Sequence, residues 1–322
     1  MKRIAIAVGG YSAEKIISLK SGEVVTDCLE NTDFECYTVL IEEDQWCLKI
    51  NSQSYLIDKS DFTAIVKNEK ISFDGVFIAI HGIPGENGQL QEYLDKLNIP
   101  YTSSSARASK ISFDKGACND FLRKNHIPCA QSIKIRSIED INIDDIIENL
   151  QLPCFIKPNA NGSSFGISKV KTKDQIIPAV ENAFKFDDVV LVESYLPGTE
   201  VTCGVHNFDS EIQTFPITEI VSQNEFFDFE AKYEGKSNEI TPARLTEDIA
   251  NLVSSTTKTI YTLLELNGIA RVDYKIVEGI PHIIEVNTIP GFSKESIIPQ
   301  QANYAGIDLK DLFLQSLNQL FS

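Results

Sequence analysis

Residues 271–296, RVDYKIVEGIPHIIEVNTIPGFSKES, carry the strongest structural signal in this chain. Apolar and polar residues alternate over most of the stretch, which predicts two short strands, because successive side chains on a strand point to opposite faces. Glu278-Gly279 is a turn signal between the strands, and a loop that contains Gly291 follows the second strand. In the second strand the alternation places Ile284 and Val286 on the apolar face. The stretch therefore predicts a β-hairpin with one apolar and one polar face.

The polar face of this hairpin brings acidic and amide side chains together. If the hairpin is symmetric about Gly279, Asp273 lies opposite Glu285, and Arg271 lies opposite Asn287. Two carboxylates placed against each other across a strand pair destabilise a sheet. A hard divalent cation would remove that conflict, because Mg2+ takes oxygen ligands and usually completes its shell with water and substrate phosphates. The alternative is a solvated polar face, and both interpretations fit the hairpin taken alone.

The length and the charge of the chain limit what it can be. At 322 residues it exceeds the roughly 100 to 200 residues of one domain, so two or three domains are expected. Its 46 Asp and Glu residues against 29 Lys and Arg residues give a formal charge of -17. General nucleic-acid and membrane-surface binders need a basic footprint, so this charge argues against both. An anionic substrate would need Lys and Arg side chains gathered at its own site.

Cysteine spacing and hydropathy indicate a reducing compartment and no membrane segment. The seven cysteines occur singly, without a CxxC pair and in an odd number, so neither a zinc ribbon nor a disulfide framework is expected. The apolar run near the N-terminus ends after about five residues, which is too short for a signal peptide. No apolar run approaches the roughly 18 residues of a membrane span. We therefore expect a cytoplasmic protein with reduced thiols.

The N-terminal part of the chain has the pattern of a doubly wound α/β fold. Ile4–Val8 is a continuous apolar run of the kind that buried parallel strands show, and it breaks at Gly9-Gly10. A helix is expected to begin near Ser12, with Ser12 as a candidate N-cap residue and Glu14 in the first turn. The alternative role of Glu14 is ordinary capping of that turn. A strand, a glycine turn and a helix in this order open such a fold.

A second predicted strand, Gly75–Ile80, leads into the loop sequence HGIPGENG at 81–88 and then into a helix expected over about 89–97. Three glycines in seven residues follow His81 at the carboxyl end of this buried strand. Open α/β sheets bind ligands at loops of this kind. The alternative is a structural histidine, which is the commoner role of a single His.

The middle and C-terminal parts of the chain follow a Ser-rich link. TSSSARASK at 102–110 indicates a domain boundary near Ser103, and a second boundary is expected just before Glu193. Between them, CFIKPNANGSSFGISKV has the pattern of strand, loop and strand. Residues 246–266 form the clearest helical stripe, and a last helix is expected over about 309–321. The sequence therefore predicts three domains, at 1–103, 104–192 and 193–322.

Two interpretations compete for the polar loop Gly162–Gly166. Its sequence GSSFG matches GxSxG, the nucleophile elbow of α/β hydrolases, and Asp273 and His282 follow it in the order of a catalytic triad. The elbow needs a helix after the serine, whereas the residues after Gly166 resume a strand pattern. The loop fits better as a flap over phosphate groups, because small residues let backbone N–H groups approach an anion and Lys157 adds a positive charge.

No standard phosphate-binding fingerprint accompanies this loop. Neither GxxxxGK[ST] nor GxGxxG occurs in the chain. Lys115 lies in the same central region as Lys157 and would supply a second positive charge to a phosphate group. Isolated lysines are usually solvated on the protein surface, which is the alternative for both side chains.

Taken together, eight segments resemble the ATP-grasp superfamily and, more closely, the D-alanine:D-alanine ligases that make the terminal dipeptide of bacterial peptidoglycan. They occur in the family's order and span nearly the whole chain. The segments are GGYSAEKIISLKSG (9–22), AIHGIPGENG (79–88), SFDK (112–115), IKPNANGSSFG (156–166), VESYLPGTEVT (192–202), FDFEAKY (227–233), ARVD (270–273) and EVNTIPGFSKES (285–296). The resemblance implies an α/β fold of three domains with ATP-grasp architecture, the first a Rossmann-like (preATP-grasp) domain. It also implies a cytoplasmic homodimer that serves cell wall biogenesis and cell shape.

The same resemblance implies where a nucleotide and metal ions would bind. ATP would lie between the central and C-terminal domains, and Glu200 would bind its ribose hydroxyls. The α- and β-phosphates would be held by Lys115 and Lys157. The loop over the transferred phosphate would contain Ser163 and Ser164. Further contacts to the nucleotide would come from Glu193, Ser194, Leu196 and Lys232. Two Mg2+ (or Mn2+) would be bound by Asp273, Glu285 and Asn287.

The implied reaction joins two D-alanines through an acylphosphate intermediate. Glu14 would bind the ammonium of the first D-alanine, with His81 nearby. The second D-alanine would contact Lys232, Ser296 and Ile297. The oxyanion of the tetrahedral intermediate would be stabilised by Arg271 and the backbone N–H of Gly291. A hydrogen-bonded link that closes a loop over the site would consist of Glu14, Ser163 and Tyr233. The resemblance thus implies D-alanine as the substrate, and we expect neither a nucleic acid nor a membrane as a partner.

Two positions depart from the family pattern, and one segment bears on the choice of substrate. Lys15-Ile16-Ile17 follows Glu14 where relatives often carry Arg and Val, and Glu295 replaces a frequent His beside Ser296. An acidic side chain there would repel the carboxylate of the second substrate unless it points away. Ligases that make D-alanyl-D-lactate differ in the EAKY segment, so the intact residues 230–233 favour the dipeptide. The alternative function is a D-alanine:D-lactate ligase.

Overall fold

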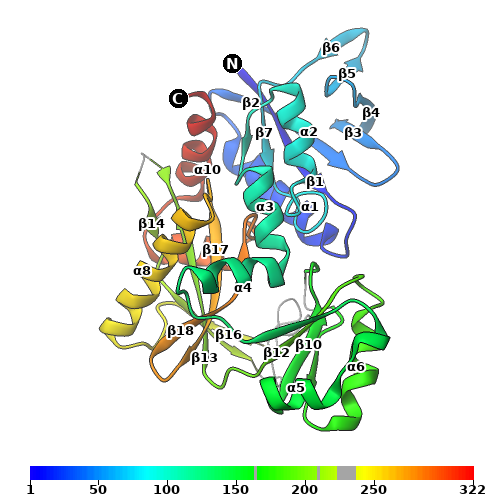
Figure 1. The fold of residues 1–322 in the computed structure, drawn as a ribbon. Helices are drawn as coiled ribbons and strands as arrows, with labels where there is room; N and C mark the ends of the chain where they lie inside the picture. Colours follow the sequence, from blue (N-terminus) through cyan, green and yellow to red (C-terminus); the bar gives the residue numbers. More distant parts are fainter. Residues whose placement is uncertain (163–164, 209–210, 223–236) are drawn as a thin grey trace.

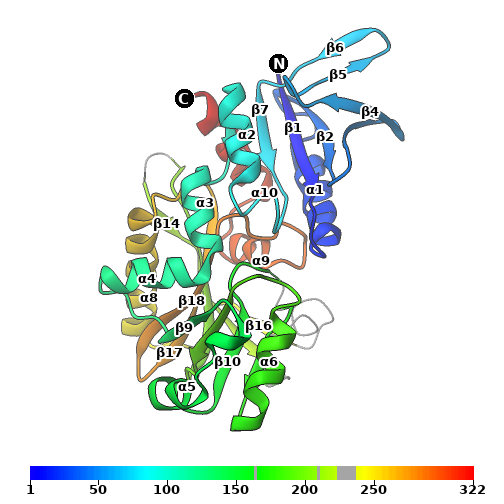
Figure 2. The same cartoon turned by 45° about the vertical axis from the view of Figure 1, so that its right-hand side comes forward.

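The computed structural model describes residues 1–162, 165–208, 211–222 and 237–322. Within those residues the chain forms three sheets with helices packed against them (Figure 1). One sheet lies at the end of the molecule where both termini are found, and the other two lie side by side at the opposite end (Figure 2). The mixed α/β architecture that the sequence predicts is therefore present. The predicted domain limits at 103/104 and 192/193 stay predictions.

The first sheet has eight strands in the order β6-β5-β4-β3-β2-β1-β7-β8. The strands β2, β1, β7 and β8 pair in parallel, as the continuous apolar runs predict. Residues 44–70, for which the sequence pattern gives no interpretation, form antiparallel strands at one edge. The strands are β1 (Lys2–Gly9), β2 (Phe34–Ile41), β3 (Trp46–Ile50), β4 (Gln53–Asp58), β5 (Thr63–Val66), β6 (Glu69–Ile71), β7 (Gly75–Ile78) and β8 (Tyr101–Thr102).

Helix α1 (Lys15–Leu29) begins three residues later than the sequence predicts. Glu14 is its N-cap residue, and Ser12 does not cap it but accepts a hydrogen bond from the Glu14 N–H at 3.3 Å. The turn before the helix is longer because Tyr11 donates its N–H to the Ile83 carbonyl. The helix lies very close to β1, since a Cβ on Gly22 would come within 2.1 Å of Val8. These contacts fix Glu14 at the carboxyl end of β1.

The second sheet has the strand order β11-β10-β12-β9 and is covered by α5 (Ile143–Leu150) and α6 (Ile176–Ala183). Its strands β10 and β11 are antiparallel neighbours, so the predicted strand-loop-strand is confirmed. A 3-10 turn, Lys173–Gln175, precedes α6. The strands are β9 (Ser132–Ile135), β10 (Cys154–Pro158), β11 (Ser168–Val170) and β12 (Val190–Ser194). A second 3-10 turn is Ile138–Asp140.

The third sheet has the strand order β16-β15-β13-β17-β18, with β14 paired to β13. Helix α8 (Glu247–Leu263), α3 (Ala106–Phe113) and α4 (Lys115–Lys124) supply residues to its core cluster. The strands are β13 (Thr199–His206), β14 (Gln213–Thr214), β15 (Thr218–Ser222), β16 (Ser237–Ile240), β17 (Ala270–Val277) and β18 (Ile280–Asn287).

The C-terminal helices return to the first sheet. Helix α9 (Ile297–Tyr304) follows the loop after β18, and α10 (Leu309–Asn318) ends in a 3-10 turn, Gln319–Phe321. Leu312 and Phe313 of α10 are fully buried in one cluster with Ile4 and Val25. The loop that joins β18 to α9 is therefore held between the first and third sheets. Helix α2 (Gln89–Leu97) covers the first sheet beside β7, as predicted.

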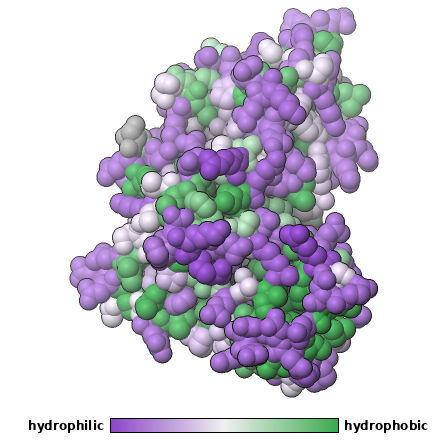
Figure 3. Space-filling view, viewed as in Figure 1, coloured by the Kyte–Doolittle hydropathy of each residue, from purple (hydrophilic) through white to green (hydrophobic). Residues whose placement is uncertain are grey.

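The surface agrees with the composition. The face shown in Figure 3 is largely hydrophilic, with hydrophobic side chains gathered mainly in its lower right part, over α5 and α6. Each of the seven cysteines is free, as their spacing predicts. Among the described helices, none combines the length and the apolar character that crossing a bilayer requires.

The predicted hairpin is β17 and β18, and its register is reached by an unexpected route. Glu278 and Gly279 both have positive φ, 51° and 81°, and form a two-residue turn that pairs Val277 with Ile280. This turn alone would place Asp273 opposite Ile284. A bulge between Asp273 and Tyr274 shifts the register by one residue. The shift pairs Asp273 with Glu285 and Arg271 with Asn287, as the sequence predicts.

The same bulge corrects one prediction about side-chain direction. Strict alternation places Ile284 on the apolar face, but Ile283 is the buried residue, with 1% of its surface exposed. Ile284 instead lies half-buried at the wall of a pocket together with Glu285. A bulge adds one residue to a strand, so the alternation of side chains is reset at that point.

Candidate active site

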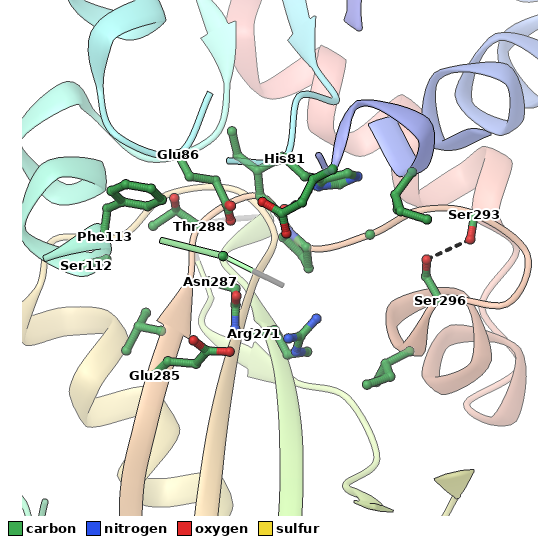
Figure 4. Close-up of a pocket in the computed structure, with 18 of the residues that line it drawn as sticks. His81, Glu86, Ser112, Phe113, Arg271, Glu285, Asn287, Thr288, Ser293 and Ser296 are labelled. Carbon is green, nitrogen blue, oxygen red and sulfur yellow. Dashed lines mark hydrogen bonds between the residues drawn. The ribbon is translucent and has the colours of Figure 1, made fainter. Parts of the chain in front are cut away.

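Two neighbouring cavities meet at the polar face of the β17–β18 hairpin. The larger, of about 400 Å3, is enclosed by the start of α1, the loop after β7, the α3–α4 junction, the hairpin and the loop before α9. The smaller, of about 140 Å3, lies between the second and third sheets. Lys115, Gly162 and Glu285 line both cavities. Side chains from segments far apart in the sequence therefore converge on one site (Figure 4).

Asp273 is hydrogen-bonded by three neighbouring side chains. Arg271 donates to both of its oxygens, with Nε and Nη2 each 2.9 Å away. Asn287 donates to Oδ2 at 3.1 Å, and Thr202 of β13 donates to Oδ1 at 2.5 Å. Sequence reasoning missed Thr202, because only the pairing of β13 with β17 brings it opposite Asp273.

The expected conflict between the two facing carboxylates is relieved by cationic side chains. Arg271 neutralises Asp273, and Lys115 Nζ lies 3.5 Å from Glu285 Oε2. Each carboxylate therefore has an opposite charge within 4 Å. The charge conflict by itself therefore does not require a metal, which corrects that step of the sequence argument.

The donor set at this face nevertheless fits a hard cation. Asp273 and Glu285 are 14% and 20% exposed, and both line the smaller cavity. With the amide oxygen of Asn287, they form an oxygen-only set of the kind that Mg2+ prefers. No cluster of three or more His, Cys, Asp or Glu side chains with metal-binding geometry occurs within residues 1–162, 165–208, 211–222 and 237–322. The candidate set has two carboxylates and an amide, which leaves coordination positions for water and phosphate oxygens.

The smaller cavity is lined by apolar walls and ion pairs. Lys157 and Glu193 form a buried pair at 2.5 Å, with side chains 6% and 9% exposed, and Asn119 donates to the same carboxylate at 3.0 Å. Lys275 pairs with Glu200 at 2.9 Å. The walls include Phe155, Tyr195, Leu196 and Ile283. A cavity with apolar walls and a few fixed polar groups is typical of small-molecule and cofactor sites.

Lys115 and Lys157 are not solvated surface charges, so that alternative is wrong for both. Lys115 is 11% exposed and donates to the Asn161 carbonyl at 2.8 Å, just before the glycine-rich loop. Buried lysines beside an open cavity hold positive charge where an anion would enter. Ser163 and Ser164 of the loop lie outside the described residues, as do Lys232 and Tyr233.

The hydrolase alternative does not survive the fold. The described residues after the GSSFG loop, from 165 on, continue into β11 and not into the helix that a nucleophile elbow needs. Asp273 is bound by Arg271, Asn287 and Thr202. His282 lies near the hairpin turn, where its Nδ1 is 3.1 Å from the Ile280 carbonyl.

His81 is a buried neutral histidine on the larger cavity. Its Nδ1 is 2.9 Å from the Ile289 carbonyl, and its Nε2 is 2.9 Å from Ser21 Oγ. Nδ1 therefore carries the proton and donates it to the carbonyl, while Ser21 donates to Nε2. Burial lowers the pKa of His81 below its ordinary value. This arrangement connects the loop after β7 to the loop after β18.

Glu14 faces the same cavity from the start of α1 and is 9% exposed. Gly162 approaches it so closely that a Cβ there would lie 2.4 Å from Glu14 Oε2. Gly82 approaches it similarly, at 2.6 Å. A Cβ at either position would push the Glu14 carboxylate aside, and Gly82 also has a positive φ of 67° that disfavours other residues. The glycines at 82 and 162 therefore serve to seat Glu14.

Glu86 is a site residue that sequence reasoning missed. It accepts a hydrogen bond from the Gly82 N–H at 2.8 Å and points into the cavity beside His81 (Figure 4). Burial, followed by the nearby charge of Glu14, raises the pKa of Glu86 to about 8. Its signal in the sequence was the acidic residue between the last two glycines of HGIPGENG. The part of the cavity near the start of α1 and the loop after β7 thus contains two carboxyl groups, Glu14 and Glu86. A cation bound between them would stabilise their negative charges.

Glu86 makes the stability of the ligand-free protein depend on pH. Its folded-state pKa of about 8 lies above the ordinary value of 4.5, so its contribution to stability is complete below the ordinary value and is lost as the pH rises through 8. Glu86→Gln stays neutral, so we expect it to raise Tm clearly at about pH 8.5 and little at about pH 5. Calorimetric scans at both pH values check this. An equal change in Tm at both, or the same pattern in the exposed control Glu30→Gln, would contradict it.

The remaining predicted residues gather at the start of α9. Ser296 is the N-cap residue of that helix, and its Oγ is 2.9 Å from Ser293 Oγ (Figure 4). Gly291 lies against it, since a Cβ at Gly291 would be 2.5 Å from Ser296 Oγ. Ile297 lines the cavity as the first helical residue. Glu295 is exposed at the rim, so it does not fill the space beside Ser296.

Comparisons with known proteins agree with this geometry. A family model described as D-ala D-ala ligase N-terminus matches residues 3–104, and one described as D-ala D-ala ligase C-terminus matches residues 121–318. The chain is 46% identical to the D-alanine–D-alanine ligase of Flavobacterium johnsoniae, over 98% of each chain. It belongs to the D-alanine–D-alanine ligase family. The ligase of Phocaeicola vulgatus is 45% identical, over the full length of both chains.

Solved structures of the ligase family show the same architecture. A D-Ala:D-Ser ligase from Enterococcus faecalis has a TM-score of 0.89 at 29% identity and covers 98% of both chains. The D-alanine–D-alanine ligase of Bacillus anthracis complexed with ATP has a TM-score of 0.78 at 29% identity, over 99% of this chain and 96% of that one. The predicted ATP-grasp fold class is thereby confirmed.

Proposed function

We propose that this chain uses ATP to join two D-alanines into D-alanyl-D-alanine, as a step in making peptidoglycan precursors. The observation that carries the proposal is the oxygen-lined hairpin face between the two cavities, at the point where the two binding sites of a ligase must meet. Family membership supports the same reaction. The D-alanine:D-lactate alternative is not favoured, since the curated relatives we compared are named for the dipeptide reaction.

The smaller cavity would take ATP. Glu193, Ser194 and Leu196 would surround the base, and Glu200 would receive the ribose hydroxyls. Lys115 and Lys157 would contact the α- and β-phosphates, which would compete with Glu285 and Glu193 for these lysines. An anion that gains two buried cations is bound strongly because little water screens the charges. Ser163, Ser164 and Lys232, outside the described residues, complete the proposed nucleotide contacts.

Asp273, Glu285 and Asn287 would hold two Mg2+ (or Mn2+). Divalent ions at this place supply positive charge to the oxygens of the transferred phosphoryl group. Arg271 and Lys115, which now neutralise the two carboxylates, would then be available for the substrates. The two cationic side chains thus already lie beside the carboxylates of Asp273 and Glu285.

The larger cavity would take the two amino acids. Glu14 would bind the ammonium of the first D-alanine beside neutral His81, leaving its carboxylate to attack the γ-phosphate. The amine of the second D-alanine then attacks the carbonyl of the acylphosphate, and the tetrahedral intermediate expels phosphate. Arg271 and the Gly291 N–H would stabilise the oxyanion. Positioning and charge therefore supply the catalysis, without a protein nucleophile.

The carboxylate of the second D-alanine would be bound where α9 begins. The first N–H groups of a helix have no acceptor within the helix, and the helix dipole favours an anion there. Ser296 adds a hydroxyl and Ile297 adds its backbone N–H at this end. Lys232 and Tyr233 would join from the segment outside the described residues, with Tyr233 linked to Glu14 through Ser163. We also propose a cytoplasmic location and a homodimer.

Mass spectrometry of the products from ATP, Mg2+ and D-alanine tests this function. We expect D-alanyl-D-alanine, ADP and phosphate in equal amounts. Parallel reactions with D-alanine plus D-serine and with D-alanine plus D-lactate identify the preferred acceptor. A clear preference for the D-lactate mixture at neutral pH would overturn the proposal, and so would binding of ATP without phosphate release when D-alanine is added.

A further inference from the structure

Glu239 of β16 is an acidic residue of the larger cavity that the roles above do not use. It lines the cavity together with Arg271, Ser296 and Ile297. Its carboxylate accepts a hydrogen bond of 2.5 Å from Gln300 Nε2, one turn into α9. The same Nε2 donates to the Glu295 carbonyl at 2.8 Å. Gln300 thereby ties β16 to the loop that carries Ser296 and fixes the direction of the Glu239 carboxylate.

The position of Glu239 complements the charges of an amino acid. An acceptor that places its carboxylate at Ser296 and at the start of α9 needs a negative group for its ammonium on the same side of the cavity. Glu14 and Glu86 reach the cavity from other elements, the start of α1 and the loop after β7. Glu295 is on the acceptor side but is exposed. Glu239 is the partly buried carboxylate that remains within the described residues of this side.

The environment of Glu239 also favours a cationic ligand. Burial raises the pKa of Glu239, and the Gln300 hydrogen bond and the charge of Arg271 act in the opposite direction. A carboxylate in such a place loses the solvation of water without gaining a close ion pair, since no salt bridge to it occurs among the described side chains. An ammonium arriving next to it would restore that missing partner.

We propose that Glu239 binds the ammonium of the second D-alanine, accepts the proton that this nitrogen gives up before it attacks, and thereby gives the acceptor subsite its preference for an amine over a hydroxyl. This inference rests on the ligase function proposed above. A hydroxy acid such as D-lactate has the same carboxylate and methyl group but no positive charge, so it gains nothing from Glu239. Gln300 acts as the positioning residue, because it holds the carboxylate toward the cavity.

Glu239→Gln tests the inference, because it keeps the shape and removes the charge. We expect the KM for D-alanine at the acceptor site to rise about 10- to 100-fold, the range for losing a hydrogen-bonded charge. The KM values for ATP and for the donor D-alanine should change less than about twofold. In a mixture of D-alanine and D-lactate, the ratio of dipeptide to depsipeptide should fall by a similar factor.

Two further variants separate this role from a general effect. Glu295→Gln removes one charge from the rim of the same cavity and should change the acceptor KM much less than Glu239→Gln does. Glu239→Asp keeps the charge at a shorter reach and should recover part of the amine preference. Melting curves of all variants show whether each remains folded.

The results distinguish a failure of this inference from a failure of the proposed function. If the wild type makes no dipeptide, the ligase function itself is wrong. If the wild type makes dipeptide but Glu239→Gln leaves the acceptor KM and the product ratio unchanged, the inference is overturned. An equal rise in the donor and acceptor KM values, or an equal effect of Glu295→Gln, would also overturn it. Should Glu239→Gln not fold, the product ratio of Gln300→Leu decides, because this variant removes the hydrogen bond that directs the Glu239 carboxylate, and an unchanged ratio would overturn the inference.

Discussion

Asp273→Asn is expected to lower phosphate release and dipeptide formation by at least about a thousandfold. Asp273 lies at the centre of the hairpin's polar face. This variant replaces one of its two carboxylate oxygens with an NH2 group and removes the negative charge. A thousandfold loss corresponds to about 4 kcal/mol of transition-state stabilisation, which is of the size that a metal ion supplies to phosphoryl transfer. Glu285→Gln should fall in the same range. Phosphate release at saturating Mg-ATP and D-alanine measures both.

Ser164→Ala is the control for these metal-site variants. We propose this serine as a nucleotide contact and not as a metal ligand, so this variant should keep more activity than Asp273→Asn or Glu285→Gln. Melting curves check that Asp273→Asn remains folded, since Arg271 loses its bidentate partner. Complete inactivation by Ser164→Ala with ATP binding intact would favour a serine nucleophile over the ligase reaction.

Arg271→Lys is expected to lower dipeptide formation about 100- to 1000-fold, the usual cost of losing one oxyanion donor. Lysine keeps the charge but lacks the planar fork that now holds both Asp273 oxygens. Because the oxyanion belongs to the second step, the first step should suffer less, and unused acylphosphate should hydrolyse. The ratio of dipeptide to ADP, measured by mass spectrometry, should therefore fall below one.

The comparison with Arg271→Met indicates how much of this effect is charge. Methionine fills a similar length without a positive charge, so it should be worse than lysine in dipeptide formation. A fully active Arg271→Lys, with one dipeptide made per ADP, would contradict the role given to the guanidinium group.

Most of the fold was predictable because its signals are local. The apolar runs at Ile4–Val8 and Gly75–Ile80 mark buried parallel strands, and both strands are present, the second ending at Ile78. The 246–266 stripe is α8 within a few residues. The late start of α1 was not predictable, since it depends on a hydrogen bond between Tyr11 and Ile83, which are far apart in the sequence.

The hairpin shows where pattern reasoning succeeds and where it stops. The assumed symmetry about Gly279 correctly placed Asp273 opposite Glu285, but period-2 alternation missed the bulge that buries Ile283 and turns Ile284 to the pocket. A bulge inserts one residue without a sequence marker of its own here. The predicted register was right because the bulge adds the shift of one residue that the two-residue turn leaves out.

Long-range contacts account for what the sequence could not supply about the site. The lysine–carboxylate pairs of Lys115 with Glu285 and of Lys157 with Glu193 join separate segments, so neither is visible as a motif. The structure brings Glu14, His81 and Arg271 to one cavity as the resemblance implies. Sequence reasoning missed Glu86, Thr202 and Glu239. Their importance depends on residues from distant segments that the fold brings next to them.

Isotope transfer from D-alanine to phosphate tests the central claim most directly. With D-alanine labelled by 18O in both carboxylate oxygens, an acylphosphate pathway transfers one labelled oxygen to the phosphate that leaves. The account predicts that mass spectrometry finds one 18O in each phosphate released together with a molecule of D-alanyl-D-alanine. Dipeptide formed alongside unlabelled phosphate would contradict the claim that ATP activates the carboxylate of D-alanine at this site.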